Sequence, residues 1–234
     1  GYILIHYGSP LVTPANTVIY PVKTSASGAF RVDARSGADG APVWTATTDY
    51  LLPPYSWMPS YSPVLTSANR VYYAGACGTV LFRSDADAAV PGATGRLAFY
   101  GLAHYQADPA SFDATVFVNT PITTDAAGNI WFGFRTTAGA PLGLASGIAR
   151  IDAAGNGTWI AAADAAADAT VTRVPHQAAP ALSADASAAS LARTSSASSA
   201  WPTAHQGSFR NSGSVRSSSA RIAARSSSPP SASR

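Results

Sequence analysis

Short apolar runs separated by turn residues recur along the chain as copies of one unit. Each copy opens with a small residue followed by proline, and successive prolines lie 53, 58 and 59 residues apart. The copies occupy residues 9–20, 62–75, 120–133 and 179–185, and the last is incomplete. Proline is tolerated at the first residue of a strand, where the missing N–H costs least. A repeat of this length predicts an array of equivalent structural units.

The pattern inside each unit predicts two hairpins. In the first hairpin, a short run leads through a turn rich in Asn, Asp or Gly to a strand that is apolar on both faces, which indicates a strand between two layers. These strands are 18–20, 71–73 and 130–132. A second hairpin follows, and its Asp and Gly residues suit the turn because they tolerate positive φ. Four strands in each unit are typical of the blades of a β-propeller.

One stretch carries a family resemblance. Ile151-Asp152-Ala-Ala-Gly155-Asn-Gly-Thr-Trp159 resembles the repeat of quinoprotein-like (PQQ-repeat type) propellers, which reads apolar, Asp, small, Gly and then Trp. Residues 32–37 with Trp44 match more loosely because 38–43 are inserted. The middle unit keeps Asp85 but has Phe99 or Tyr100 where Trp would stand. The resemblance extends over about residues 9–182.

The resemblance and the repeats together predict an all-β chain. Residues 1–182 are expected to form a partial β-propeller of about three four-stranded antiparallel blades, at about 9–49, 62–101 and 119–163. Trp44 and Trp159 are expected to dock between neighbouring blades. The predicted core residues are Val18, Tyr20, Phe30, Val32, Val71, Tyr73, Leu81, Ile130, Phe132, Ile148 and Ile151. Because propellers typically have about four to eight blades, we expect a piece of a longer protein, with residues 1–7 as the last strand of a preceding blade.

The charge is divided unevenly between body and tail. The net charge is +3, but residues 1–185 hold nine Lys or Arg against twelve Asp, and the remaining residues hold six Arg and no acid. Residues 183–234 are rich in Ser, Ala and Arg and poor in large apolar side chains, which predicts a disordered tail. We hypothesise that the reading frame shifts near residue 186. The alternative is a genuine tail that binds nucleic acid or an acidic surface through its six Arg. The other two reading frames of the coding DNA would decide between them.

A connection rich in proline and aromatic residues joins the first two predicted blades. Residues 50–61 contain Tyr55, Trp57 and Tyr61. Loops on a rigid scaffold often carry function, so these rings are candidates for stacking on a sugar or a peptide. Aromatic side chains also bury large areas, and the plain alternative is that they cover the edge of the core.

A second connection contains His104, Tyr105, Asp108 and Asp113. His104 and Tyr105 are binding candidates, and a His near two carboxylates could form an acid–base pair or part of a metal site. The spacing matches no metal motif, which favours a solvated loop.

The single cysteine and two acidic turns have plain interpretations. Cys77 is expected to be a small buried residue in a blade strand rather than a reactive thiol. The near-identical turns 125–129 and 152–156 have too few alternating oxygen donors for a calcium loop and are expected to be hairpin turns.

The preferred functional interpretation is a non-catalytic scaffold or binding module that takes a protein or carbohydrate ligand at the propeller face, with no predicted cofactor and no membrane span. The resemblance also allows a PQQ-dependent oxidoreductase with calcium, although the chain has no Glu and no Cys pair. A propeller hydrolase or lyase using His104 or a loop Asp is the second alternative. By analogy with the family, a periplasmic or extracellular location is favoured.

Overall fold

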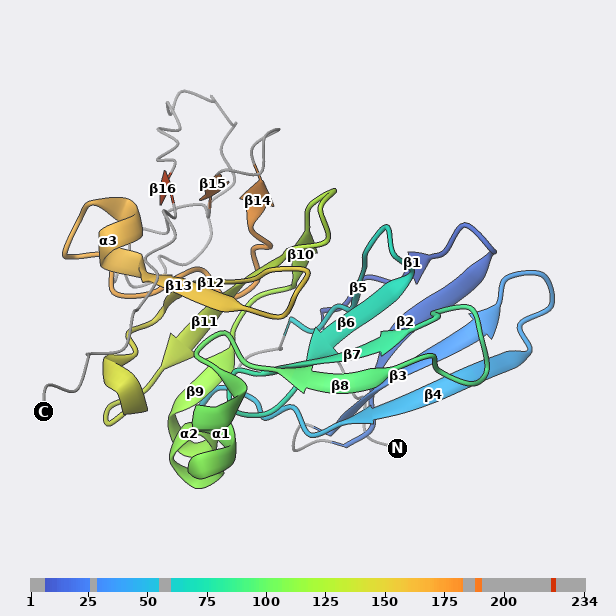
Figure 1. Ribbon diagram of the computed structural model, residues 1–234, viewed down its shortest axis with the longest axis horizontal. Helices are drawn as coiled ribbons and strands as arrows, with labels where there is room; N and C mark the ends of the chain where they lie inside the picture. Colours follow the sequence, from blue (N-terminus) through green and yellow to red (C-terminus); the bar gives the residue numbers. More distant parts are fainter. Residues whose placement is uncertain (1–6, 26–28, 55–59, 183–187, 191–219, 222–234) are drawn as a thin grey trace, which may run out of the picture.

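Antiparallel sheets dominate the computed structural model, which describes residues 7–25, 29–54, 60–182, 188–190 and 220–221. Three sheets follow one another in chain order, and each is built around four strands joined as consecutive hairpins (Figure 1). Helices are few and short. The prediction of an all-β chain with repeated antiparallel sheets is confirmed.

The sheets are named first, second and third in the order of the chain. The first contains β1 (Leu11–Val12), β2 (Thr17–Lys23), β3 (Phe30–Ser36) and β4 (Pro42–Thr48). The second contains β5 (Val64–Leu65), β6 (Arg70–Ala74), β7 (Val80–Ser84) and β8 (Thr94–Leu97). The third contains β10 (Thr123–Thr124), β11 (Ile130–Thr136), β12 (Gly147–Ile151) and β13 (Gly157–Ala161), and β9 (Val116–Val118) also pairs with β11. The helices are α1 (Leu102–Ala107), α2 (Pro109–Thr115), α3 (Ala162–Ala166) and the 3₁₀ turn η1 (Pro141–Gly143).

The first hairpin of each of these three sheets closes with the same three-residue loop. In the first sheet, the Asn16 N–H donates to Thr13 O at 2.9 Å and the Thr13 N–H donates to Thr17 O at 3.0 Å. The last loop residue has positive φ, which only Gly, Asn or Asp adopt readily. That position holds Asn16 (φ 63°), Asn69 (φ 55°) and Gly128 (φ 82°). The turn residues in the sequence therefore mark real hairpins.

The second hairpin of each sheet, called the outer hairpin below, differs from the repeat predicted from the sequence. The β3–β4 turn begins at Ser36, whose N–H donates to Ala41 O, whereas the β12–β13 turn begins at Asp152, whose N–H donates to Asn156 O. Asp33 lies within β3, opposite Tyr20, so its assumed equivalence with Asp152 is wrong. In the second sheet the turn closes between Ser84 and Ala93.

The two tryptophans of the repeat lie on opposite faces of their sheets. The register of β3 and β4 shifts between Ala34 and Arg35 and leaves one extra residue, Val43, in β4. Trp44 therefore lies on the forward face of the first sheet, which is the face directed toward the next sheet in the chain. There its indole N–H donates to Ala86 O of the second sheet at 2.6 Å. Trp159 packs back against Phe134 and the core shared with the second sheet. Only the Trp44 indole makes a hydrogen bond to the neighbouring sheet, whereas Trp159 contacts a ring of its own sheet and packs on the shared core.

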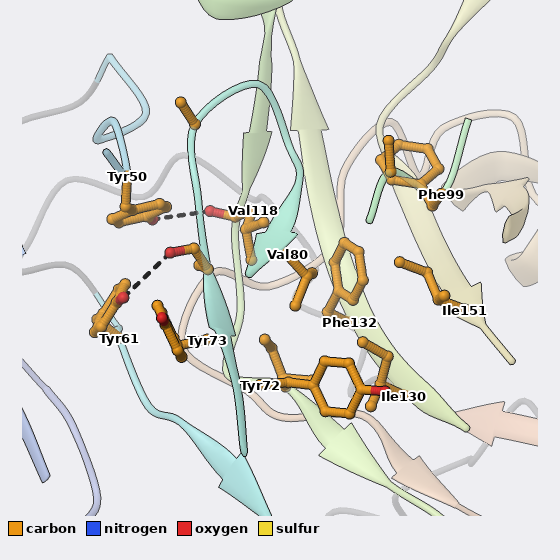
Figure 2. Packing of buried hydrophobic residues seen from close by; sticks show 14 of the residues in the cluster. Tyr50, Tyr61, Tyr72, Tyr73, Val80, Phe99, Val118, Ile130, Phe132 and Ile151 are labelled. Carbon is orange, nitrogen blue, oxygen red and sulfur yellow. Dashed lines mark hydrogen bonds between the residues drawn. The ribbon is translucent and has the colours of Figure 1, made fainter. Parts of the chain in front are cut away.

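One apolar core runs through all three sheets. Figure 2 shows it on both sides of the second sheet, with Tyr50, Tyr61 and Tyr73 on one side and Phe132 and Ile151 on the other. Eight of the eleven predicted core residues are buried, and the exceptions, which are half-buried, are Val18, Tyr20 and Leu81. Their neighbours Ile19 and Val80 are buried instead. In these strands both faces are apolar, so the sequence pattern does not show which face is covered.

Polar contacts also join the sheets. The Asp49 carboxylate accepts from Arg96 of β8 at 2.6 Å and from the Ala76 N–H at 3.0 Å. The first-hairpin loops of the second and third sheets meet where Ser67 donates to Ala126 O at 3.5 Å. The short strands β5 and β10 therefore lie close together, as the inner strands of neighbouring blades would.

A fourth unit begins after the third sheet. β14 (Ala181–Leu182) follows Pro180 directly, just as β1 and β5 follow their prolines, and it pairs with β15 (Ala188–Ser190), which pairs with β16 (Ala220–Arg221). Val174 and Leu182 pack against Trp131 on the forward face of the third sheet. The rest of the predicted disordered tail, like residues 1–6, lies outside the described residues.

The connection after the second sheet is helical rather than the expected solvated loop. Pro109 occupies the first turn of α2, and the Asp108 carboxylate caps that helix by accepting from the Ser111 N–H at 3.2 Å. The Phe112 ring stacks on Tyr100 with centroids 4.3 Å apart, which anchors α2 to the core. Across the described ranges, no helix has the length and apolar character needed to span a membrane.

Candidate functional site

The structure describes three of the five residues proposed for binding, Tyr61, His104 and Tyr105. Tyr55 and Trp57 lie outside the described residues. Tyr61 is only 2% exposed and stacks on Phe30 with ring centroids 4.6 Å apart. Its hydroxyl donates to Ala74 O at 3.1 Å (Figure 2). The stacking role proposed for Tyr61 is therefore wrong, because a buried ring cannot offer a face to a ligand.

Burial also affects the ionisation of Tyr61. Removal from water raises the pKa of Tyr61 well above its ordinary value. Tyr50 lies beside it and donates from its hydroxyl to Val118 O at 2.9 Å (Figure 2). These hydroxyls tie the connection between the first two sheets to the core, so they serve the fold.

Cys77 is a buried structural thiol. It lies in a tight turn with φ 61°, and its thiol donates to the Asp113 carboxylate of α2 at 2.7 Å. Burial, reinforced by this hydrogen bond and by the carboxylate charge, raises the pKa of the thiol. A thiol held in its neutral form is a poor nucleophile. The expectation of a small buried residue agrees with this environment, but the expected place in a strand is wrong, because Cys77 lies in the turn between β6 and β7.

His104 and Tyr105 are neighbours on α1 with different surroundings. His104 is exposed, and Tyr105 is half-buried beneath Arg96, whose guanidinium carbon lies 5.1 Å from the ring centroid. Burial raises the pKa of Tyr105 although the Arg96 charge opposes it. Only His104 of this pair reaches the cleft described next.

An open cleft lies between the end of the second sheet and the outer edge of the third. Its volume is about 1050 Å³. One wall is the chain from Leu97 to His104, including the start of α1, and the other is β13 with Leu142, Leu144 and Asp164. The Trp159 side chain lies on the second wall. The cleft thus combines an aromatic ring and several apolar side chains with an imidazole and a carboxylate.

The backbone of the cleft floor is packed closely. Gly157 of β13 lies directly against Phe99, and a methyl group on Gly157 would collide with the Phe99 backbone. Gly155 precedes it with φ 94° in the β12–β13 turn and lies against Leu97. These glycines allow the two walls to meet at one end, so the cleft opens toward Trp159 and α3.

The acidic turns behave as hairpin turns. Burial by itself would raise the pKa of Asp125, but hydrogen bonds from Asn129 and Trp131 outweigh it and lower that pKa. The Asp152 carboxylate likewise accepts from the Asn156 N–H at 2.8 Å. Within the described ranges, no three His, Cys, Asp or Glu side chains gather closely enough to hold a metal ion.

Sequence reasoning identified one cleft residue and missed the others. His104 was proposed, whereas Trp159 was assigned only to packing, and Leu142 and Asp164 were not considered. The lining comes from two segments more than 35 residues apart in the chain. An edge strand next to a helix carries no sequence signal of its own, so only the folded structure brings these residues together.

Comparisons with known proteins give little further guidance. No protein-family model matches the chain, and no curated protein does. Among solved structures, a luciferin-regenerating enzyme is similar at 13% identity and a TM-score of 0.45. The alignment covers 80% of this chain and 52% of that structure, so this chain spans about half its length.

Proposed function

We propose that this chain is part of a quinoprotein-like β-propeller, contributes three blades to it, and acts as a non-catalytic binding module. The ligand would lie in the cleft between α1 and β13. The observation that carries this proposal is the cleft itself, whose lining includes Trp159 together with His104 and Asp164.

Three features support the blade assignment. Each of the three sheets is built around four antiparallel strands in chain order, each first hairpin ends in the same loop, and one core runs through neighbouring sheets. Four-stranded sheets that repeat in this way are the building units of propellers. The blades would follow the three sheets, and the strand after Pro180 would begin a fourth.

Two features support ligand binding. Ligand pockets commonly measure about 300 to 1,000 Å³ and combine apolar walls with a few polar groups, and this cleft has a similar size and composition. The cleft also lies where the chain passes from one proposed blade to the next. Loops on a rigid scaffold commonly carry binding residues.

The test places a large side chain in the cleft by a substitution on α1. Ala103 is exposed and lines the cleft, while Ala107 is exposed on the same helix but is not part of the lining. The immobilised chain is screened by surface plasmon resonance against defined oligosaccharides and short peptides. We expect Ala103→Trp to weaken binding of the ligand found by more than about tenfold and Ala107→Trp to leave it unchanged. Failure of every panel member to bind, or equal loss in both variants, would contradict the proposal.

The alternatives make different predictions. A PQQ-dependent oxidoreductase would bind the quinone with a calcium-dependent change in its absorbance and would reduce an artificial electron acceptor. A hydrolase or lyase would lose turnover of a chromogenic substrate when His104 is replaced by Ala. The binding module that we propose shows neither property.

A further inference from the structure

The hydrogen-bond ladder of the third sheet shows which backbone groups of β13 face away from β12. The Asp152 N–H donates to Asn156 O, and the Ala162 N–H donates to Ser146 O, both at 2.9 Å. The register between these ends pairs residue 148 with 160 and residue 150 with 158. Hydrogen-bonded pairs alternate with non-bonded pairs in an antiparallel ladder. The even-numbered residues of β13 therefore bond to β12, while the odd-numbered ones face outward.

Trp159 and Ala161 provide the backbone groups along the open part of the outward edge of β13. β13 is the last strand of its sheet. Gly157 also faces outward, but the Phe99 backbone lies against it. Ala161 is the N-cap residue of α3, so its carbonyl serves the first turn of the helix. The N–H and C=O of Trp159 and the N–H of Ala161 remain directed outward, and these groups lie along the cleft.

The cleft admits a single extended chain better than a second sheet. The segment from Tyr100 to His104 forms a wall opposite the edge, so the approach is confined on two sides. β4 also ends its sheet, but no residue of β4 lines this cleft. An edge with outward donors and acceptors is a template for an added strand.

We infer that an extended peptide adds to β13 as a further strand and occupies the cleft. This inference rests on the proposed binding function and names the ligand class of the same site. Alternate side chains of a strand point to opposite sides. One set would face the apolar lining, which includes Leu97, Leu102 and Leu144, and the other set would face the open mouth of the cleft.

The probe is a fluorescein-labelled octapeptide of alternating valine and serine, titrated with the full chain and followed by fluorescence anisotropy. Two derivatives carry N-methyl groups on all the valine amides or on all the serine amides. A paired strand uses the N–H groups of alternate residues only. One derivative should therefore bind like the parent, and the other should bind at least about tenfold more weakly.

A proline at position 161 tests the edge from the protein side. Ala161 has φ −64°, which matches the φ that proline fixes, and its N–H bonds to nothing in β12. Ala161→Pro should fold normally but lose one donor and crowd the edge, which weakens octapeptide binding at least about tenfold. Ala161→Ser keeps the N–H and should bind like the parent chain. Unchanged circular dichroism and melting temperature would establish that the proline variant is folded.

The outcomes separate the two proposals. If both N-methylated peptides bind like the parent, or if folded Ala161→Pro binds normally, strand addition is wrong. If the peptides fail but an oligosaccharide binds and is displaced by Ala103→Trp, the binding function stands and the peptide inference falls. If the chain forms a dimer that Ala161→Pro abolishes, the edge pairs with a second copy, and the inference is again wrong.

Discussion

In each of the three sheets, the turn of the first (inner) hairpin depends on a single residue with a left-handed backbone conformation. Asn16, Asn69 and Gly128 occupy equivalent loop positions with positive φ. Their identity could be predicted from sequence, because Asn and Gly between apolar runs are a recognised turn signal. The conformation of Cys77, with φ 61°, was missed although Gly75 and Gly78 flank it and glycine is a turn signal.

The conformation of Asn16 leads to a stability prediction. Its φ of 63° disfavours residues with an ordinary Cβ, and its side chain is exposed. Asn16→Ala should lower the free energy of unfolding by about 1–2 kcal/mol, whereas Asn16→Gly should lower it by less. Urea denaturation of the two variants provides the comparison. Equal losses would show that backbone conformation is not the cause.

The environment of Cys77 predicts slow alkylation of its thiol. Its thiol is buried and donates to Asp113, so iodoacetamide at pH 8 should leave it unmodified in the folded chain. Full modification should follow in urea, which serves as the positive control. Rapid labelling without denaturant, detected by mass spectrometry, would refute the assignment of a structural thiol.

The same burial predicts loss of stability in alkali. The folded-state pKa values of Cys77, Tyr61 and Tyr100 are raised, mainly by burial. These groups lose protons more readily in the unfolded chain, so raising the pH above the ordinary thiol value of 9.0 favours unfolding. The melting temperature should therefore fall from about pH 9 upward. A melting temperature that stayed constant to pH 11 would contradict this expectation.

At the scale of elements, the strands were more predictable than their connections. The repeated unit located all three inner hairpins because apolar runs and turn residues alternate there. The helices α1 and α2 were missed although Asp108 followed by Pro109 is a readable helix start, with an N-cap and proline in the first turn. Their position depends on Phe112 stacking on Tyr100, a contact between distant elements that local sequence does not reveal.

The contact between β4 and the second sheet can be tested at one atom. The Trp44 indole N–H donates to Ala86 O at 2.6 Å in a buried setting. Trp44→Phe keeps much of the apolar area but leaves that carbonyl without its donor, so it should cost about 1–3 kcal/mol. Thermal unfolding measures the loss. The matched change Trp159→Phe should cost less, because no hydrogen bond of its indole is observed in the described structure.

For the whole molecule, a continuous core should make the three sheets unfold together. The cluster runs from Phe30 in the first sheet through Val71 to Phe132 in the third, and each of these side chains is almost fully buried. The candidate site could not be predicted at this scale, because its two walls meet only after the second and third sheets pack. His104 was identified as a surface residue, whereas the role of Trp159 depends on which face of β13 is covered.

Phe132→Ala tests the shared core. Phe132 is fully buried, so its truncation should cost about 3–5 kcal/mol. If the sheets unfold as one unit, hydrogen exchange monitored by mass spectrometry should accelerate in β2, β6 and β11 together. Acceleration confined to the third sheet would mean that the sheets are independent units. Val90→Ala, at a side chain that is 78% exposed, serves as the control.

The extra residue in β4 means that the units are not interchangeable modules. It directs Trp44 forward from the first sheet, while Trp159 points backward from the third. A rearranged gene in which the third unit directly followed the first would bring both indoles to one interface and crowd it. The reverse order would place neither Trp44 nor Trp159 at that interface. Any shuffling or duplication of these units must therefore also redesign the faces that meet.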